Sequence, residues 1–360
     1  MARFPSTRAG ASARIRRRHA CRRFAALVCI FVCALGAFET FVRWTHKAFV
    51  APWIHVTSHT PNEWLELPRK CRRRLAFCLP LDVVDVRPGV VDARGTFERT
   101  KTYARMYNAA VQDGIEVFHR GATTTQGLSV DDMFAVGVDG QLIPKLMSLE
   151  IPVRAIVMPF PIGAVSNAMY MGTVKHLEAF GFTPNVNVYL QDPDVFHFSV
   201  FHASHHLDEH AVDADAYRTE AYNISNVTQA SCPIDAILER VFVTSGGVVV
   251  AGWNVEKTSR GEPSRLRKEL RQALPNAPEN QLVSDLYILH TTLARIVGTP
   301  FAGADGRDIA KRMSQALTDE LCGLELTLDT AWFVEEKHKL ALALRGAINK
   351  IALPLACGKI

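Results

Sequence analysis

The pattern of hydrophobic and polar positions predicts a chain of alternating strands and helices. Apolar runs in which every second residue is polar indicate strands, and apolar positions three or four residues apart indicate helices. From residue 151 onward a strand–helix–strand unit occurs twice, which is typical of a domain that combines helices with sheets. We expect strands over residues 81–86, 133–138, 151–158, 186–190, 194–201, 232–244, 247–255, 289–295 and 325–335, and helices over residues 98–113, 163–180, 211–219, 263–274 and 309–317.

Two of the expected strands carry a histidine followed, two residues later, by a hydroxyl residue. Successive side chains of a strand point to opposite faces, so His197 and Ser199 share one face of the first strand. His290 and Thr292 share one face of the second, and the apolar residues between them face a core. If the two strands are neighbours, two imidazoles and two hydroxyls converge on one cleft. Such a set can cleave a phosphodiester by acid/base catalysis without a metal.

The second motif extends beyond its histidine and hydroxyl residue to a longer sequence pattern. Residues 290–295, His-Thr-Thr-Leu-Ala-Arg, are close to the His-x-Thr-Leu-Ala-Arg form of the ligase-like branch of the two-histidine (2H) phosphoesterase superfamily. The chain resembles this superfamily over about residues 150–350. Bacterial RNA 2′,5′-ligase-like proteins, cyclic phosphodiesterases of tRNA splicing and plant RNA ligase/cyclic nucleotide phosphodiesterase-like proteins are similar. Residues 201–204, Phe-His-Ala-Ser, depart from the Phe-Leu-Gly ending usual in that branch.

The resemblance implies a fold, an activity and a set of site residues. The fold is α+β and two-lobed, with antiparallel sheets, helices outside and a central cleft. The activity is hydrolysis of a 2′,3′-cyclic nucleotide or RNA end without a cofactor. One histidine acts as the base and the other as the acid, and we favour His290 as the base and His197 as the acid, although the orientation of the substrate decides this. Ser199 and Thr292 hold the phosphate oxygens. The alternative is a membrane-anchored protein that binds a nucleotide or phosphate without turnover.

A second group of polar residues follows the first motif strand. One interpretation of this group is a polar loop at the mouth of a pocket. The other is a metal site with His202, His206 and His210 as ligands, which would make the protein a metalloenzyme. No glycine-rich nucleotide-binding motif or P-loop is present, so nucleoside triphosphate chemistry lacks support. The members of the group are His202, His205, His206, Asp208, Glu209 and His210.

Two further positions near the motifs carry charge. Arg295 lies on the opposite strand face from Thr292 if alternation continues, and it either binds a carboxylate within the sheet or reaches a phosphate. Residues 335–339, Glu-Glu-Lys-His-Lys, indicate a solvated strand end. Neither position is assigned to the site from the sequence.

The net charge of +5 is unevenly distributed. Residues 1–23 contain eight arginines and no acidic residue, and subtracting those eight charges leaves the remainder of the chain near −3. The rest of the chain is therefore not a strongly basic nucleic-acid binder. A short RNA end or a small nucleotide suits it better than a long duplex.

A charge-free apolar stretch over residues 24–38 follows the arginines. Residues 24–42 predict a transmembrane signal-anchor, with a basic tail (1–23) in the cytosol and the C-terminal part in the lumen of an endomembrane compartment. The alternatives are a cleaved signal peptide and a transit peptide for the mitochondrion or chloroplast. A linker (43–79), an N-terminal extension (80–150) and the 2H-like domain (151–350) complete the expected organisation.

Cysteines and sequons leave the compartment open. Of the eight cysteines, three lie in or beside the apolar N-terminal segment, and the five that remain are an odd number without CxxC spacing. Cys71 and Cys78 are close enough in sequence to pair, but nothing requires a disulfide framework or a zinc site. Two adjacent sequons, at Asn223 and Asn226, fit a luminal domain.

Overall fold

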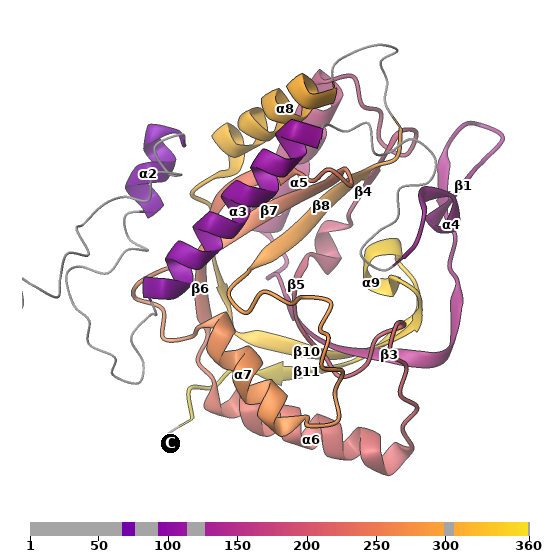
Figure 1. Ribbon diagram of the computed structural model, residues 1–360, viewed down its shortest axis with the longest axis vertical. Coiled ribbons are helices and arrows are strands. Elements are labelled where there is room, and N and C mark those ends of the chain that lie inside the picture. The colour runs from indigo at the N-terminus through magenta and orange to yellow at the C-terminus, as the bar shows by residue number, and fades with distance from the viewer. Residues whose placement is uncertain (1–66, 76–92, 114–126, 299–305, 359–360) are drawn as a thin grey trace, which may run out of the picture. The chain divides into compact units, whose positions relative to one another are not determined.

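Two antiparallel sheets make up the body of the protein in the computed structural model, which describes residues 67–75, 93–113, 127–298 and 306–358 (Figure 1). The four-stranded sheet has the order β11 (Ile348–Pro354), β10 (Thr330–His338), β3 (Ser148–Pro159), β5 (His197–His202). The five-stranded sheet has the order β4 (Val188–Leu190), β8 (His290–Ile296), β7 (Val248–Val255), β6 (Ile234–Val243), β9 (Glu325–Leu328). The expected combination of helices with antiparallel sheets is confirmed.

Each sheet has its own helices. Helices α5 (Ala164–Ala179) and α8 (Gly306–Leu321) contact each other and the five-stranded sheet, whereas α6 (Ala214–Ala230) and α7 (Pro263–Ala273) contact strands of the four-stranded sheet. In Figure 1, α6 and α7 lie beyond β10 and β11, while α3 and α8 lie beside β6 and β7. The short elements are α2 (Arg69–Leu75), α4 (Val130–Met133), β1 (Phe134–Val136), β2 (Leu142–Pro144), a 3₁₀ turn (Pro193–Val195) and α9 (Ala341–Leu344).

A cluster of aromatic rings joins the two sheets directly behind the first motif. Trp253 on β7 lies with its ring centroid 5.4 Å from that of Phe160 and 5.8 Å from that of Phe198. Phe198 stands between His197 and Ser199 in sequence and is fully buried. Aromatic packing of this kind contributes energy beyond the burial of area. The core therefore fixes the motif strand from the face opposite to its polar residues.

Helix α3 (Ala93–Asp113) belongs to the expected N-terminal extension and packs against β6 and β7. The Tyr103 hydroxyl lies 2.8 Å from the carbonyl oxygen of Trp253 and accepts a hydrogen bond from the Leu289 amide at 3.0 Å. Its ring lies over Gly252, where an added Cβ would stand only 2.9 Å from the ring atoms. Any larger residue than glycine on β7 at this point would displace α3. The extension thus reaches the strand that leads into the second motif.

A buried polar network holds the first half of α3. The Arg99 guanidinium donates to Asn254 Oδ1 at 3.0 Å and to Glu262 Oε1 at 2.8 Å, and its side chain is inaccessible to solvent. Thr100 donates to the buried Glu239 carboxylate at 2.7 Å. Because breaking one partner of such a network strands a buried charge, the position of α3 on the sheet is strongly determined.

Several expected elements have different bounds. The helix expected over 211–219 is α6, which continues to Ala230 because Ile224 and Thr228, four residues apart, are buried against the core. The strand expected over 325–335 is two strands, since the chain leaves the five-stranded sheet after β9 and enters the four-stranded sheet as β10. β11 was not expected. Residues between β1 and β2 form the turn of a hairpin, with Gly140 at φ 79°.

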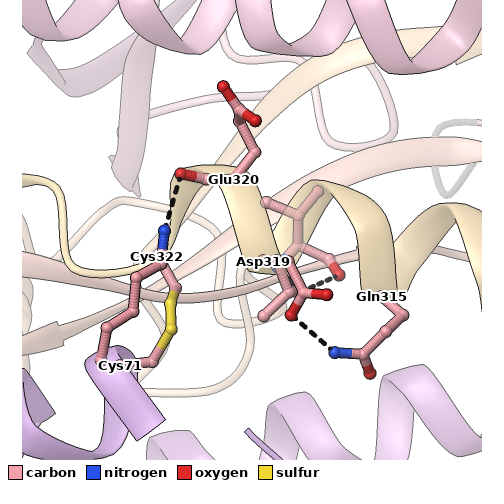
Figure 2. The surroundings of a disulfide bond; sticks show 8 residues. Cys71, Gln315, Asp319, Glu320 and Cys322 are labelled. Atoms are coloured by element: carbon pink, nitrogen blue, oxygen red, sulfur yellow. Dashed lines mark hydrogen bonds between the residues drawn. A yellow bond between two sulfur atoms is a disulfide. The ribbon is translucent and has the colours of Figure 1, made fainter. Parts of the chain in front are cut away.

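Two disulfides close the fold, Cys71–Cys322 and Cys232–Cys357, with Cα–Cα distances of 5.6 Å and 4.2 Å. The suggested pairing of Cys71 with Cys78 is therefore wrong, because Cys71 in α2 lies against the end of α8 (Figure 2). A partner 251 residues away cannot be read from local spacing. Cys78 and the expected membrane anchor lie outside the described residues. Within the described ranges, no helix is long and apolar enough to cross a membrane.

Candidate active site

A cavity of about 670 Å³ opens between the two sheets, and all four motif side chains line it. This volume lies within the range of small-molecule sites. The first motif enters the cavity from β5 and the second from β8, while α3 and residues 282–288 form part of the wall. The cavity thus brings together two short motifs that are 93 residues apart. The four side chains are His197, Ser199, His290 and Thr292.

The first motif has the alternation expected of its strand. His197 and Ser199 are half-buried on the cavity side, and Phe198 and Val200 are buried in the core. His197 begins β5 directly after the 3₁₀ turn, and its Nδ1 lies 2.8 Å from the carbonyl oxygen of Val195. Since a carbonyl can only accept, Nδ1 carries a proton there. Nε2 is therefore the nitrogen that is left to exchange a proton with a ligand.

The second motif has the same alternation on β8. His290 and Thr292 are half-buried at the cavity, whereas Leu289, Thr291 and Leu293 are buried. In the β7–β8 ladder His290 stands opposite Gly252, so the tyrosine of α3 that covers this glycine also adjoins the motif. The expected shared face of histidine and hydroxyl is confirmed for both motifs.

The two motif strands belong to different sheets, which the sequence did not show. β5 pairs with β3, and β8 pairs with β4 and β7. The strands are nevertheless in contact, because the Thr291 hydroxyl donates to the His197 carbonyl oxygen at 2.6 Å. Thr291 is the residue that the alternation places away from the cavity. Its hydroxyl links the two histidine-bearing segments across the junction of the sheets.

Arg267 on α7 makes a second connection between the two motif segments, with four hydrogen bonds. Its buried guanidinium donates to the carbonyl oxygens of Val200 (3.0 Å) and Ser199 (3.2 Å) on β5. It also donates to those of Leu286 (2.7 Å) and Ile288 (2.8 Å), just before β8. Burial lowers the pKa of Arg267 to about 10, so it remains a cation at neutral pH. One side chain therefore satisfies four carbonyls and sets the distance between the motifs.

Burial controls the protonation of both motif histidines. Burial, together with the nearby charges of Arg267 and His197, lowers the pKa of His290 to about 4. Burial also lowers the pKa of His197, but the hydrogen bond to the Val195 carbonyl acts in the opposite direction by stabilising the imidazolium. Of the two, His197 has a partner for its protonated form, and His290 faces a cation. The surroundings favour a proton on His197 and a free lone pair on His290.

Arg295 lies on the cavity side of β8, in contrast to the expectation that it faces away from Thr292. The β7–β8 ladder pairs Val250 with Thr292 and Val249 with Ala294, so Leu293 is an extra residue in the register. Such a bulge shifts the alternation by one residue. Arg295 and Thr292 consequently both line the cavity. Burial lowers the pKa of Arg295 to about 10, which keeps it positively charged.

The histidines after β5 have different surroundings, although the rings of His202, His205 and His206 lie near one another, with centroid distances of 6.2 Å and 6.5 Å. His202 lines the cavity, and burial lowers its pKa to about 3. His205 Nε2 lies 2.8 Å from the carbonyl oxygen of Asn280, and His210 lies 2.8 Å from the Asp208 carboxylate at the surface. Among the residues that the structure describes, no group of three or more metal-binding side chains is arranged to hold an ion. The metal interpretation of His202, His206 and His210 finds no support there.

Several residues that build the site were not predicted from the sequence. Arg267, which does not line the cavity, is one of several basic residues of its helix, and Glu336 was interpreted as part of a solvated strand end. Gln191, Thr102 and Met106 carry no motif, yet they also line the cavity. For Arg267 one signal was available, since it follows Leu266 at the edge of the apolar stripe of α7.

Comparisons with known proteins give structural matches only. No protein-family model and no curated protein matches the chain. A conserved protein of unknown function from Agrobacterium tumefaciens is 12% identical, with a TM-score of 0.44, over 66% of this chain and 97% of that one. E. coli LigT in complex with 3′-AMP is 12% identical, with a TM-score of 0.35, over 57% and 96%. Kluyveromyces marxianus Usb1 with uridine monophosphate is 11% identical, with a TM-score of 0.34, over 56% and 98%.

At these identities and TM-scores the matches do not determine what this chain does. The cavity, its two histidines and their surroundings carry the functional argument instead.

Proposed function

We propose that this protein is a phosphodiesterase that hydrolyses 2′,3′-cyclic phosphates of nucleotides or RNA ends by two-histidine acid/base catalysis. The observation that carries the proposal is the cavity in which β5 and β8 each present a half-buried histidine and, two residues on, a hydroxyl. The net charge near −3 outside the arginine-rich start favours a small nucleotide or an RNA end over a long duplex.

In the proposed reaction His290 removes a proton from the attacking water. The water oxygen bonds to phosphorus, the bond from phosphorus to one ribose oxygen breaks, and His197 donates its proton to that oxygen. The assignment rests on the surroundings, because Arg267 disfavours a second positive charge on His290 and the Val195 carbonyl favours one on His197. Two histidines that differ in this way can hold one proton between them, as acid/base catalysis requires.

Ser199, Thr292 and Arg295 hold the phosphate in this proposal. The two hydroxyls lie on the same strand faces as the histidines, and Arg295 remains cationic on the wall of the same cavity. Hydroxyls and a guanidinium are donors that stabilise the charge that develops on the non-bridging oxygens. The contribution of Arg295 follows from the bulge at Leu293, which turns it to this side.

The test is hydrolysis of the four 2′,3′-cyclic nucleoside monophosphates by the full-length protein, with and without EDTA. We expect turnover that survives the chelator, since the proposed groups are imidazoles and hydroxyls. Tight binding of nucleotides without any turnover would favour a non-catalytic binding protein. Activity that EDTA abolishes and His290→Ala retains would refute the two-histidine mechanism and revive a metalloenzyme.

We also infer that the protein is anchored by residues 24–42 and faces an oxidising lumen. Two disulfides support this inference, because such bonds persist in oxidising compartments. Asn226 is exposed on α6, whereas Asn223 is half-buried and donates to the Ala273 carbonyl at 3.3 Å. We expect Asn226→Gln to abolish an endoglycosidase-sensitive shift and Asn223→Gln to leave one. Absence of glycan together with freely alkylated Cys71 in cells would point to the transit-peptide alternative.

A further inference from the structure

Glu336 on β10 lies at the cavity instead of in solvent. It lines the same cavity as the two motifs, and its Oε1 accepts a hydrogen bond from the Leu342 amide at 2.9 Å. Its neighbour Glu335 does not line the cavity and instead accepts a hydrogen bond from the Asn349 side chain at 2.7 Å. Two adjacent glutamates thus have different surroundings, one in the cavity and one on the outside of the sheet.

The side chain of Gln191, next to a strand of the five-stranded sheet, also binds the backbone of Leu342. It follows β4, is only 4% exposed, and donates from Nε2 to the Leu342 carbonyl oxygen at 3.0 Å. The Leu342 peptide groups therefore hold two polar side chains, one from each sheet, at one place in the cavity wall. Since the glutamine uses Nε2 and the glutamate uses Oε1, the remaining atoms are Gln191 Oε1 and Glu336 Oε2. Both are acceptors when the carboxyl group is ionised.

In the part of the chain that the structure describes, Glu336 has its hydrogen bond from the Leu342 amide and no ion pair, and burial raises its pKa to about 7. A carboxylate in such a place is stabilised by a ligand that donates hydrogen bonds to it. Apolar side chains of Leu340, Leu342 and Leu344, with Tyr189, line the cavity as well. Acceptors beside apolar walls suit a flat, N–H-rich ring.

We propose that Glu336 and Gln191 recognise the nucleobase of the substrate and select guanine. Guanine presents a ring N–H next to an amino group, which together match the two oxygens of a carboxylate. Adenine and cytosine present an amino group beside an acceptor nitrogen, and uracil presents one N–H between two carbonyl oxygens that a carboxylate repels. The inference rests on the proposed function, in which the phosphate of the same nucleotide lies between His197 and His290. A cavity of about 670 Å³ has room for both parts.

The experiment compares wild type, Glu336→Gln and the matched control Glu335→Gln on 2′,3′-cyclic GMP and 2′,3′-cyclic UMP. Glutamine keeps an oxygen to accept from Leu342 but places an amide N–H against the N–H groups of guanine. We expect wild type to prefer the guanine substrate by about 10–100-fold in kcat/KM. Glu336→Gln should remove this preference through a higher KM for the guanine substrate, with kcat and thermal stability nearly unchanged. Glu335→Gln should behave as wild type.

Binding of 3′-GMP and 3′-UMP to the same three proteins, measured by calorimetry, separates this inference from the proposed function. Guanine-selective binding that depends on Glu336, without hydrolysis of any cyclic phosphate, would refute the proposed reaction and retain the base recognition. Hydrolysis of all four cyclic nucleotides at equal rates, unaffected by Glu336→Gln, would overturn the base recognition and retain the reaction. Equal loss of both substrates in Glu336→Gln would also overturn it, since a structural role predicts that result.

Discussion

β8 lies inside the five-stranded sheet with β4 and β7 on its sides, whereas β5 is the last strand of the four-stranded sheet and pairs with β3 alone. The two strands carry the same motif in the same alternation. Each histidine has one paired residue in a ladder, Gly252 on β7 for His290 and Pro159 on β3 for His197. On its other side β5 has no strand and is held by the Thr291 hydroxyl and by the Arg267 contacts. β5 therefore relies on side chains on the side where β8 has β4.

The largest effect should follow removal of either imidazole. We expect His197→Ala and His290→Ala each to lower the rate of cyclic phosphate hydrolysis by about 10²–10⁴-fold, the usual scale for a lost general acid or base. The double variant should be little worse than either single one, because the two groups act as a unit. Single-turnover rates at saturating substrate measure this. An additive loss in the double variant would show that the motifs act independently.

Arg267→Met tests whether side chains place the first motif. It leaves four carbonyl oxygens without a donor, so we expect a loss of about 2–5 kcal/mol in the free energy of unfolding by denaturant titration, and reduced activity. Lys268→Met on the exposed face of α7 is the control and should change neither. An Arg267→Met protein with unchanged stability and rate would show that β3 alone suffices to position β5.

The hydroxyls should have smaller effects. Ser199→Ala and Thr292→Val each remove one hydrogen-bond donor among several to the phosphate, and we expect about a tenfold loss in kcat/KM. If the edge strand is the less firmly held one, Ser199→Ala should also raise KM more than Thr292→Val does. Steady-state kinetics on one cyclic nucleotide decide the point, and equal KM values would remove that distinction between the strands.

The pH profile should show the smallest but most specific difference. Activity requires His290 unprotonated, so kcat/KM should rise through a pKa of about 4, and it requires His197 protonated, so it should fall through a pKa below 6.5. The optimum is expected on the acid side of neutral. Without the nearby cation of Arg267, protonation of His290 becomes easier, so Arg267→Met should move the acid limb to higher pH. An unmoved acid limb would reassign the base.

Local pattern was sufficient for the motif faces, because alternation depends only on neighbouring residues. It placed His197, Ser199, His290 and Thr292 on polar strand faces, and the structure confirms all four at one cavity. The roles proposed for them remain predictions.

Contacts between distant parts of the chain could not be predicted in the same way. The extra residue at Leu293 places Arg295 on the cavity side of β8. The hydrogen bond from the Leu342 amide holds Glu336 at the cavity, although its neighbours in sequence are mostly charged. The assignment of β5 and β8 to different sheets depends on pairings with β3 and β7, and alternation within a strand says nothing about its neighbours.

The bond between Cys71 and Cys322 changes how the molecule transmits force. It joins α2, near the start of the described chain, to the end of α8, which packs on β6. A pull on α2 therefore reaches α8 and the five-stranded sheet through the sulfur atoms. Helix α3 and the cavity wall that it forms receive that load through the packing of α3 on α8.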